Sequence, residues 1–344
     1  MDTSTFQRFK DSLLARRISL SAWLVSTPPE EQHLRLGQAQ AGQLEEQFQV
    51  IDTAIGEASD QTLGLCEVCH DYVETRRLEM DYTCHICLDH LSEEERRRLE
   101  DELELAMVVQ RSLLPQRLPE FPGLEFAAFS RPAQIVGGDY FDFLHFADGS
   151  HGVAIADVAG HGVSSSLLMA SLQTALRTLA MVSASPEEVV QRIDHLYHHN
   201  INFASFVTLF LGRFDLNQQS FTYCNAGHNP PLVLRNGNGA VSDHEWLRPT
   251  GAAIGLVEGA TYQAEKIQLN TGDMLILYTD GVTEAANPQG EQYGWDRLAE
   301  SLHAAGDVSP RRLVAALRSS LQDFAAGQPL DDDTTIVVCK VNGV

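Results

Sequence analysis

The chain has 344 residues, of which 44% are hydrophobic and 21% charged, and its formal net charge is −23. This composition is typical of a folded protein with room for more than one domain, and it excludes wholesale disorder. The acidic charge argues against nucleic acid and anionic membrane surfaces as partners. No apolar run reaches the length of a membrane-spanning helix, and the first residues lack the apolar stretch of a signal peptide, so we expect a cytoplasmic protein.

Residues 1–62 are predicted to be a helical N-terminal region. Apolar residues recur with helical spacing in 4–24 and in 31–60, as at Leu44, Phe48, Ile51 and Ile55. The segment Thr27–Pro29 interrupts this pattern, because proline removes a backbone donor and restricts the residue before it. The sequence therefore predicts a helical hairpin.

Residues 63–91 contain four of the six cysteines, arranged as two Cys-x2-Cys pairs with fourteen residues between them. Two such pairs are typical of a tetrahedral structural Zn²⁺ site, which would stabilise a segment too short to build its own core. Redox-active cysteines are the alternative, but the βαβ context of such pairs is missing. We predict one Zn²⁺, held by Cys66, Cys69, Cys84 and Cys87.

Residues 92–115 are predicted to form a linker helix. Ser92 with Glu95 three residues later is a capping-box signature, and no helix breaker follows until Pro115. Alternating spacings of four and three residues give a short coiled-coil seam of Leu99, Leu103, Ala106, Gln110 and Leu113. This seam indicates a homodimer through residues 92–114, and the alternative is an amphipathic helix docked on its own domain.

Residues 120–344 are predicted to be the catalytic domain. From Leu124 onward the chain contains at least eight short segments rich in β-branched and aromatic residues and bounded by Gly, Asp, Asn and Pro. Helical segments occur in pairs, one pair after the third strand and another before the last strand. The expected fold class is α+β, with helices covering two stacked antiparallel sheets.

Aspartates stand at several predicted strand ends, beside glycine or another acid. A single aspartate there is explained by turn formation. Carboxylates that converge on one rim of a sheet, however, repel one another unless a cation neutralises them, and an oxygen-only ligand set favours Mg²⁺ or Mn²⁺. The candidate ligands are Asp139, Asp157, Asp280, Asp332 and Asp333.

Five motifs in this order, VGGDYFD, ADVAGHG, NAGHNPPL, LYTDGVTEA and DDDTT, resemble the bacterial SpoIIE/RsbU-like branch of the metal-dependent protein serine/threonine phosphatases. The resemblance implies an α-β-β-α sandwich with two Mn²⁺ or Mg²⁺ ions at one end. It also implies that Asp157 bridges the two ions, with Asp139 and the carbonyl of Val158 on one side. Asp280 and Asp332 would hold the other ion, and Asp331 or Asp333 is the alternative to Asp332.

Three further residues near these motifs are candidates for chemistry. His161 is either the proton donor to the leaving seryl oxygen or a structural residue of its turn. Arg131 is a candidate phosphate contact. His228 lies in a family motif near the site, where we expect it to shape a loop.

The cysteine segment also resembles the DksA/TraR-type zinc finger, although its gap between the Cys pairs is shorter. Together the resemblances imply a phosphatase that acts on a phosphorylated regulatory protein, a STAS-type anti-sigma-factor antagonist, and that is regulated by its zinc-bearing module. The alternatives are a catalytically silent scaffold whose DksA-like module binds RNA polymerase or another partner, and an enzyme that hydrolyses small phosphorylated metabolites.

Overall fold

The computed structural model describes residues 3–26, 41–133, 135–160, 162–200, 206–237, 240–328 and 332–342. The chain divides into two compact units, residues 1–101 and residues 102–344. Among the described residues, no helix is both long and apolar enough to cross a membrane. The expected α+β class is confirmed, because a helical N-terminal region precedes a sandwich of two sheets.

The described residues of the first unit form two long helices, α1 (Thr3–Ser26) and α3 (Ala41–Ser59), followed by the short helix α4 (Thr75–Met80) and the 3-10 turn η1 (Leu88–His90). The link between α1 and α3, which includes Thr27–Pro29, lies outside the described residues. The unit has one small apolar core, to which both helices and the cysteine segment contribute: Phe6, Phe9, Leu13, Ala54, Ala58, Leu63, Cys66, Val73, Leu78 and Cys87.

Helix α5 (Glu93–Leu113) begins with the predicted capping box. The Glu95 backbone N–H donates to Ser92 Oγ at 3.2 Å, and the Ser92 backbone N–H donates to Glu95 Oε2 at 2.9 Å. Its last turns belong to the second unit, where Gln110 is buried and Leu113 packs against an apolar core. At Gln110 and Leu113 the structure agrees with the alternative of a helix docked on its own domain, because both side chains contact the second unit and are not free to contact a partner helix.

The second unit contains two five-stranded antiparallel sheets among its described residues. One has the order β1-β10-β9-β6-β7 and the other β2-β3-β4-β5-β8. The strands are β1 (Leu124–Arg131), β2 (Tyr140–His145), β3 (His151–Val158), β4 (Val207–Asp215), β5 (Ser220–Ala226), β6 (Leu232–Gly237), β7 (Ala240–Trp246), β8 (Glu265–Gln268), β9 (Met274–Tyr278) and β10 (Thr334–Val341).

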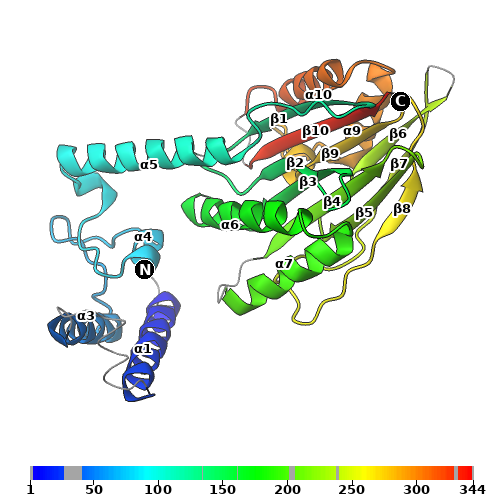
Figure 1. Cartoon of the computed structure of the whole chain (residues 1–344). Coiled ribbons are helices and arrows are strands. Elements are labelled where there is room, and N and C mark those ends of the chain that lie inside the picture. Colours follow the sequence, from blue (N-terminus) through cyan, green and yellow to red (C-terminus); the bar gives the residue numbers. More distant parts are fainter. Residues whose placement is uncertain are drawn as a thin grey trace. The chain divides into compact units, whose positions relative to one another are not determined.

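Helices cover the outer faces of both sheets (Figure 1). Helices α6 (Val163–Ala180) and α7 (Pro186–Asn200) pack on the β2-β3-β4-β5-β8 sheet, and α9 (Gly294–Ala305) and α10 (Pro310–Ala325) pack on the other. A third apolar core fills the space between the sheets. The short helix α8 (Asp280–Thr283) follows β9 directly. The predicted α-β-β-α sandwich is therefore confirmed.

Strand alternation explains why polar residues collect at one end of this inner core. Side chains two residues apart point to the same face of a strand. Phe141 of β2, Ile155 of β3 and Val337 of β10 all lie in the core between the sheets. Asp139, Asp157 and Thr335 lie two residues from these core residues, respectively, all toward the same end of the sandwich. The alternation that buries the aromatic and aliphatic side chains thus directs this polar set to the rim between the sheets.

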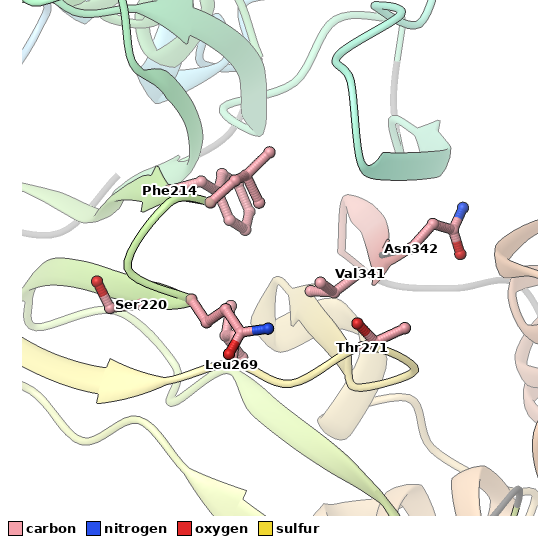
Figure 2. Close-up of a pocket in the computed structure, with 8 residues that line it drawn as sticks. Phe214, Ser220, Leu269, Thr271, Val341 and Asn342 are labelled. Atoms are coloured by element: carbon pink, nitrogen blue, oxygen red, sulfur yellow. The ribbon is translucent and has the colours of Figure 1, made fainter. Parts of the chain in front are cut away.

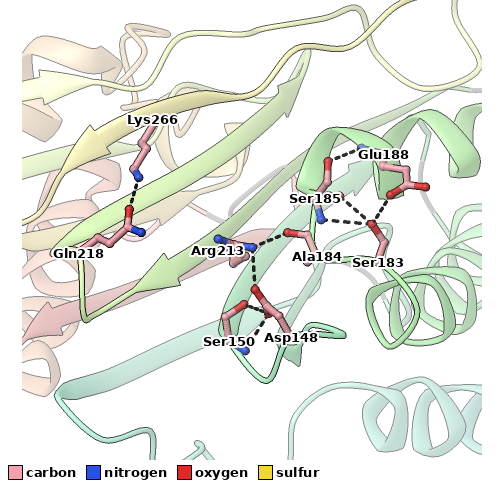
Figure 3. A network of polar contacts seen from close by, with 9 residues as sticks. All are labelled: Asp148, Ser150, Ser183, Ala184, Ser185, Glu188, Arg213, Gln218 and Lys266. Carbon is pink, nitrogen blue, oxygen red and sulfur yellow. Dashed lines mark hydrogen bonds and ion pairs between the residues drawn. The ribbon is translucent and has the colours of Figure 1, made fainter.

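The other end of the sandwich has a different character. A cavity of about 20 Å³ there is lined by eight residues, including Phe214, Leu269 and Val341, and none of the eight carries an ionisable side chain (Figure 2). Nearby, the guanidinium of Arg213 donates to Asp148 Oδ2 at 2.9 Å and to the Ala184 carbonyl at 2.7 Å, which ties the β2–β3 hairpin to the α6–α7 loop (Figure 3). These contacts are structural.

Candidate metal centre and active site

The β2–β3 ladder brings Asp139 beside Asp157. Tyr140 pairs with Ala156, so the next residues outward on the two strands are Asp139 and Asp157. On its other side Asp157 pairs with Thr208 of β4. The register of the β2–β3 pair therefore places two carboxylates side by side on the rim of one sheet. Sequence alternation alone could not establish that these two residues are neighbours.

The second sheet contributes Asp280 and Asp332. Asp280 is the first residue of α8, immediately after β9, and Asp332 precedes β10. Burial raises the pKa of Asp157 to about 8, with further contributions from the charges of Asp280 and Asp332. Burial, followed by the charge of Asp332, likewise raises the pKa of Asp280 to about 6. The effect of Asp280 and Asp332 on Asp157 indicates that acids from the two sheets lie close together.

Asp139 is the most enclosed of these acids, with 6% of its surface exposed. Its Oδ2 accepts a 2.8 Å hydrogen bond from Thr279 Oγ1, whereas its Oδ1 has no hydrogen-bond partner among the described residues. Burial, and next the charge of Asp157, holds its pKa well above the usual range. A buried, unpaired carboxylate oxygen facing other acids is costly unless a cation binds it, so the residues present fit a hard divalent cation.

Asp333 has a different environment from its neighbour Asp332. Its two carboxylate oxygens accept backbone hydrogen bonds from Gly138 at 2.6 Å and Ala133 at 2.8 Å, across the loop that leads to Asp139. Asp332 is exposed, and its Oδ1 accepts a bond from the Asp333 backbone N–H at 2.8 Å. Asp333 therefore stabilises the loop through hydrogen bonds, whereas the exposed Asp332 carboxylate is more available to bind a cation.

Glycine is required where backbone segments meet at this rim. A Cβ atom on Gly138 would lie 2.6 Å from the carbonyl oxygen of Val158 and 3.3 Å from Asp157 Oδ1. A Cβ on Gly281 would lie 2.0 Å from the carbonyl oxygen of Asp333. Both spacings are too short for a side chain. The VGGD and TDG motifs are thus explained by close approach, and the Val158 carbonyl lies at the rim with the carboxylates.

His228 is buried between the sheets, with 2% of its surface exposed. Its Nδ1 lies 2.8 Å from Thr208 Oγ1 and its Nε2 lies 3.2 Å from the Tyr278 carbonyl oxygen. Burial lowers its pKa to about 4, so the ring is neutral at physiological pH. A carbonyl can only accept, so Nε2 carries the proton and Nδ1 accepts from the threonine.

A cavity of about 370 Å³ opens beside Asp139 and Asp333. Arg131, which is exposed at the end of β1, lines the same cavity, and so does Gln110 of α5. Gln110 makes two hydrogen bonds with Gly137: its Oε1 accepts from the Gly137 N–H at 3.2 Å, and its Nε2 donates to the Gly137 carbonyl. The seam pattern identified Gln110 as a coiled-coil position and missed this contact.

Two of the residues singled out in the sequence lie outside the described part of the chain. They are His161 and Asp331. Thr208 and Thr279, in contrast, were missed by sequence reasoning, because threonine at a strand end carries no signal of its own until the partner strand is known.

In the first unit, four potential zinc ligands form a compact cluster. The ligand atoms of Cys66, Cys69, Cys87 and His90 all lie within 4.8 Å of one another. Hydrogen bonds from the backbone, first that of Cys69, lower the pKa of the Cys66 thiol to about 6, whereas burial and the neighbouring Cys66 raise that of Cys87 to about 11. Crowded thiols that share protons in this way are suited to a divalent cation.

The predicted fourth ligand, Cys84, is not a member of this cluster. The 3-10 turn η1 after Cys87 brings His90 Nδ1 to 3.1 Å from Cys87 Sγ. Cys84 instead lies in a turn in which its backbone N–H donates to the Asp81 carbonyl at 3.2 Å. Cys87-x2-His90 has the same spacing as Cys84-x2-Cys87, but only the latter pair entered the prediction, and the path of the chain brings His90 rather than Cys84 into the cluster.

Comparison with known proteins supports the resemblance of the second unit to the SpoIIE/RsbU-like phosphatases. The model of the family described as Stage II sporulation protein E (SpoIIE) matches residues 147–342. The phosphoserine phosphatase RsbU of Bacillus subtilis (strain 168) is 30% identical over 263 residues, which cover 76% of this chain and 75% of RsbU. The phosphoserine phosphatase RsbP of the same organism is 25% identical over 244 residues, which cover 70% of this chain and 58% of RsbP.

Solved structures show the same fold. The SiaA-PP2C domain of Pseudomonas aeruginosa superposes with a TM-score of 0.63 at 22% identity, covering 71% of this chain and 98% of that domain. The RsbU and RsbW domains of Rv1364c from Mycobacterium tuberculosis give a TM-score of 0.54 at 27% identity, covering 65% of this chain and 62% of that chain.

A two-sheet sandwich covered by helices on both faces, with acids from both sheets converging on one rim, is the architecture of the PP2C-type protein serine phosphatases. Within that class, this chain belongs to the SpoIIE family.

Proposed function

We propose that this protein hydrolyses phosphoserine on a regulatory protein, with two Mn²⁺ or Mg²⁺ ions held by Asp139, Asp157, Asp280 and Asp332. The observation that carries the proposal is the convergence of acids from two sheets, including the buried and unpaired Oδ1 of Asp139. Two such cations, when bound, acidify a water molecule and hold a phosphoryl group in line for attack.

The chain's own residues have distinct roles in this proposal. Asp157 lies between Asp139 and the acids of the other sheet, and in this proposal it would be the ligand shared by the two ions, with the Val158 carbonyl as a further ligand beside Asp139. Asp333 keeps its loop-fastening role, which favours Asp332 as the ligand. Arg131, which lines the adjacent cavity, would contact the phosphoryl group. His161 would either protonate the leaving seryl oxygen or serve as a structural residue of its turn.

A phosphorylated STAS-type anti-sigma-factor antagonist is the proposed substrate. The support comes from RsbU and RsbP, which are named as phosphoserine phosphatases and share sequence with 76% and 70% of this chain, respectively. A small phosphorylated metabolite is the competing substrate class, and the experiment below distinguishes the two.

The test uses the full-length chain with Mn²⁺, a phosphoserine STAS protein, free phosphoserine and p-nitrophenyl phosphate. We expect metal-dependent release of phosphate from the STAS protein but not from free phosphoserine. Asp157→Ala and Asp280→Ala, checked for folding by circular dichroism, should abolish the activity. Persistent activity in either variant would refute the assignment, and equal rates on free phosphoserine would favour metabolite hydrolysis.

For the first unit we propose a structural Zn²⁺ held by Cys66, Cys69, Cys87 and His90, and a regulatory function for residues 1–91 exerted through the linker helix 92–115. A relationship to DksA/TraR-type fingers requires Cys84 as a ligand, so measuring which variants lose zinc also tests that resemblance. A homodimer through 92–114 would have to use the exposed side chains of α5, among them Leu105, Val108 and Val109.

A further inference from the structure

We propose that His228 is a positioning residue for the metal centre, because its imidazole ring joins the two sheets that carry the two halves of the carboxylate set. The inference rests on the proposed two-cation function. It concerns a side chain that touches neither the reacting atoms nor the proposed cations, yet is bonded to residues next to the proposed ligands on both sheets.

The metal centre needs such a link because its ligands come from independent layers. Asp139 and Asp157 belong to the β2-β3-β4-β5-β8 sheet, whereas Asp280 and Asp332 adjoin strands of the other sheet. Two catalytic cations stand about 3.5 to 4 Å apart, so a small sliding of one sheet over the other would separate the ligand sets. Apolar contacts between the sheets are non-directional and do not by themselves prevent such sliding.

The His228 ring supplies directional contacts to both layers. Its Nδ1 accepts from Thr208 Oγ1 at 2.8 Å, and Thr208 pairs directly with Asp157 in the β3–β4 ladder. Its Nε2 donates to the carbonyl of Tyr278, two residues before Asp280, at 3.2 Å. One rigid ring thus sets the distance between the strand next to Asp157 and the strand that leads to Asp280.

The NAGH sequence holds the ring in this place. The side chain of Asn225 accepts from the His228 backbone N–H at 2.8 Å and donates to the Leu247 carbonyl at 3.1 Å. Gly227 has φ +67°, and a Cβ atom there would lie 2.8 Å from the backbone nitrogen of Ala253. A side chain at position 227 is therefore strained, and the chain can turn there only because it has none.

This arrangement leaves the ring unsuited to proton transfer. Both nitrogens are engaged within the protein, and the ring is buried, with 2% of its surface exposed. A positioning role predicts a change in cation affinity, whereas a role in proton transfer predicts a change in kcat when cations are saturating.

The experiment compares His228→Gln, His228→Asn and Thr208→Val in the full chain. Glutamine can keep the donor to Tyr278, asparagine can keep the acceptor for Thr208, and valine removes the threonine hydroxyl at nearly constant volume. Binding of Mn²⁺ is read from the electron paramagnetic resonance signal of the free ion, and hydrolysis of p-nitrophenyl phosphate is measured against Mn²⁺ concentration. We expect Mn²⁺ affinity to fall about 10-fold or more, with kcat at saturating Mn²⁺ close to that of the wild type.

Two further variants separate positioning from general destabilisation. Combining His228→Gln with Thr208→Val should weaken Mn²⁺ binding little beyond the single variants, because both remove one link. Arg213→Met, at the far end of the sandwich, should lower the melting temperature without changing Mn²⁺ affinity.

Unchanged Mn²⁺ affinity in folded His228→Gln and Thr208→Val would overturn the inference, as would a loss of kcat at unchanged affinity. If the wild-type protein bound no Mn²⁺, the proposed function itself would fail. That result differs from failure of the His228 inference, in which the wild type binds Mn²⁺ and the variants bind it equally well.

Discussion

At the scale of single residues, the acids at the rim carry an electrostatic cost when no cation is bound, and Asp157 is one of the acids that show it. Burial together with the charges of Asp280 and Asp332 raises the pKa of its carboxyl group to about 8, compared with 3.8 for an ordinary aspartate. Protons and cations therefore compete for the same oxygens between pH 6 and 8.

The pH dependence of stability follows from this shift. An acid whose pKa is raised on folding stabilises the metal-free protein below the unfolded value of 3.8, and this contribution is lost as the pH rises through about 8. We expect the melting temperature of the metal-free second unit to fall between pH 6 and pH 8, and added Mn²⁺ to raise it more at pH 8 than at pH 6. Thermal unfolding at the two pH values tests this.

Asp157→Asn is the control for this titration, because the amide keeps the shape but does not ionise. The variant should show a smaller fall in melting temperature between pH 6 and pH 8 and little stabilisation by Mn²⁺. An equal effect of Mn²⁺ at both pH values in the wild type would contradict the assignment of the shift to Asp157.

The zinc ligands give a second prediction for single residues. His90, not Cys84, lies with Cys66, Cys69 and Cys87, so we expect Cys84→Ala to retain about one zinc per chain and Cys69→Ala to lose it. His90→Ala should weaken binding. Zinc content is measured by atomic emission after gel filtration. Loss of zinc from Cys84→Ala, with retention in His90→Ala, would restore the ligand set of two Cys-x2-Cys pairs.

At the scale of elements, α5 is joined to the loop that carries Asp139. The two hydrogen bonds between Gln110 and Gly137 satisfy the buried backbone N–H and carbonyl of Gly137, two residues before the proposed ligand Asp139. The linker helix therefore has a contact through which its position can affect the proposed metal centre, and this contact lies wholly within the second unit.

Replacing Gln110 by leucine tests the value of this contact. Leucine fills a similar volume but leaves the Gly137 N–H and carbonyl unpaired, which should cost roughly 1–3 kcal/mol in the free energy of unfolding of the second unit. Urea denaturation followed by tryptophan fluorescence measures it. The exposed Arg111→Leu on the same helix is the control and should change stability little. Equal stability of Gln110→Leu and the wild type would show that solvent satisfies the peptide group.

At the scale of the whole molecule, the two units differ in how they are stabilised. Among the described residues, the second unit has three apolar cores in successive layers, whereas the first has one small core that includes two of the clustered cysteines. A small domain with so little apolar burial depends on a metal or other crosslink.

Removal of zinc should therefore affect the units separately. We expect a chelator to abolish the thermal transition of the first unit and to leave that of the second unit in place, as seen by scanning calorimetry in the presence of excess Mg²⁺ to keep the phosphatase site supplied. Cys69→Ala should show the same single remaining transition. Loss of both transitions together would mean that the units do not unfold independently.

The architecture of the second unit could largely be predicted from local patterns in its sequence. Alternation of apolar residues indicated two sheets, the paired helical segments indicated their coverings, and the aspartates at strand ends indicated a rim of converging acids, because strand period and turn chemistry act over a few residues. The capping box at Ser92 belongs to the same class of local signal and was confirmed.

Other features were decided only by tertiary structure. Whether Cys84 or His90 joins the cysteine cluster, whether Gln110 faces a partner helix or Gly137, and how His228 connects Thr208 to Tyr278 all depend on segments distant in the chain. Local spacing does not decide any of these contacts. Tertiary packing decides these contacts, because the polar atoms of a buried side chain can form hydrogen bonds only with the neighbours that the folded chain brings to them.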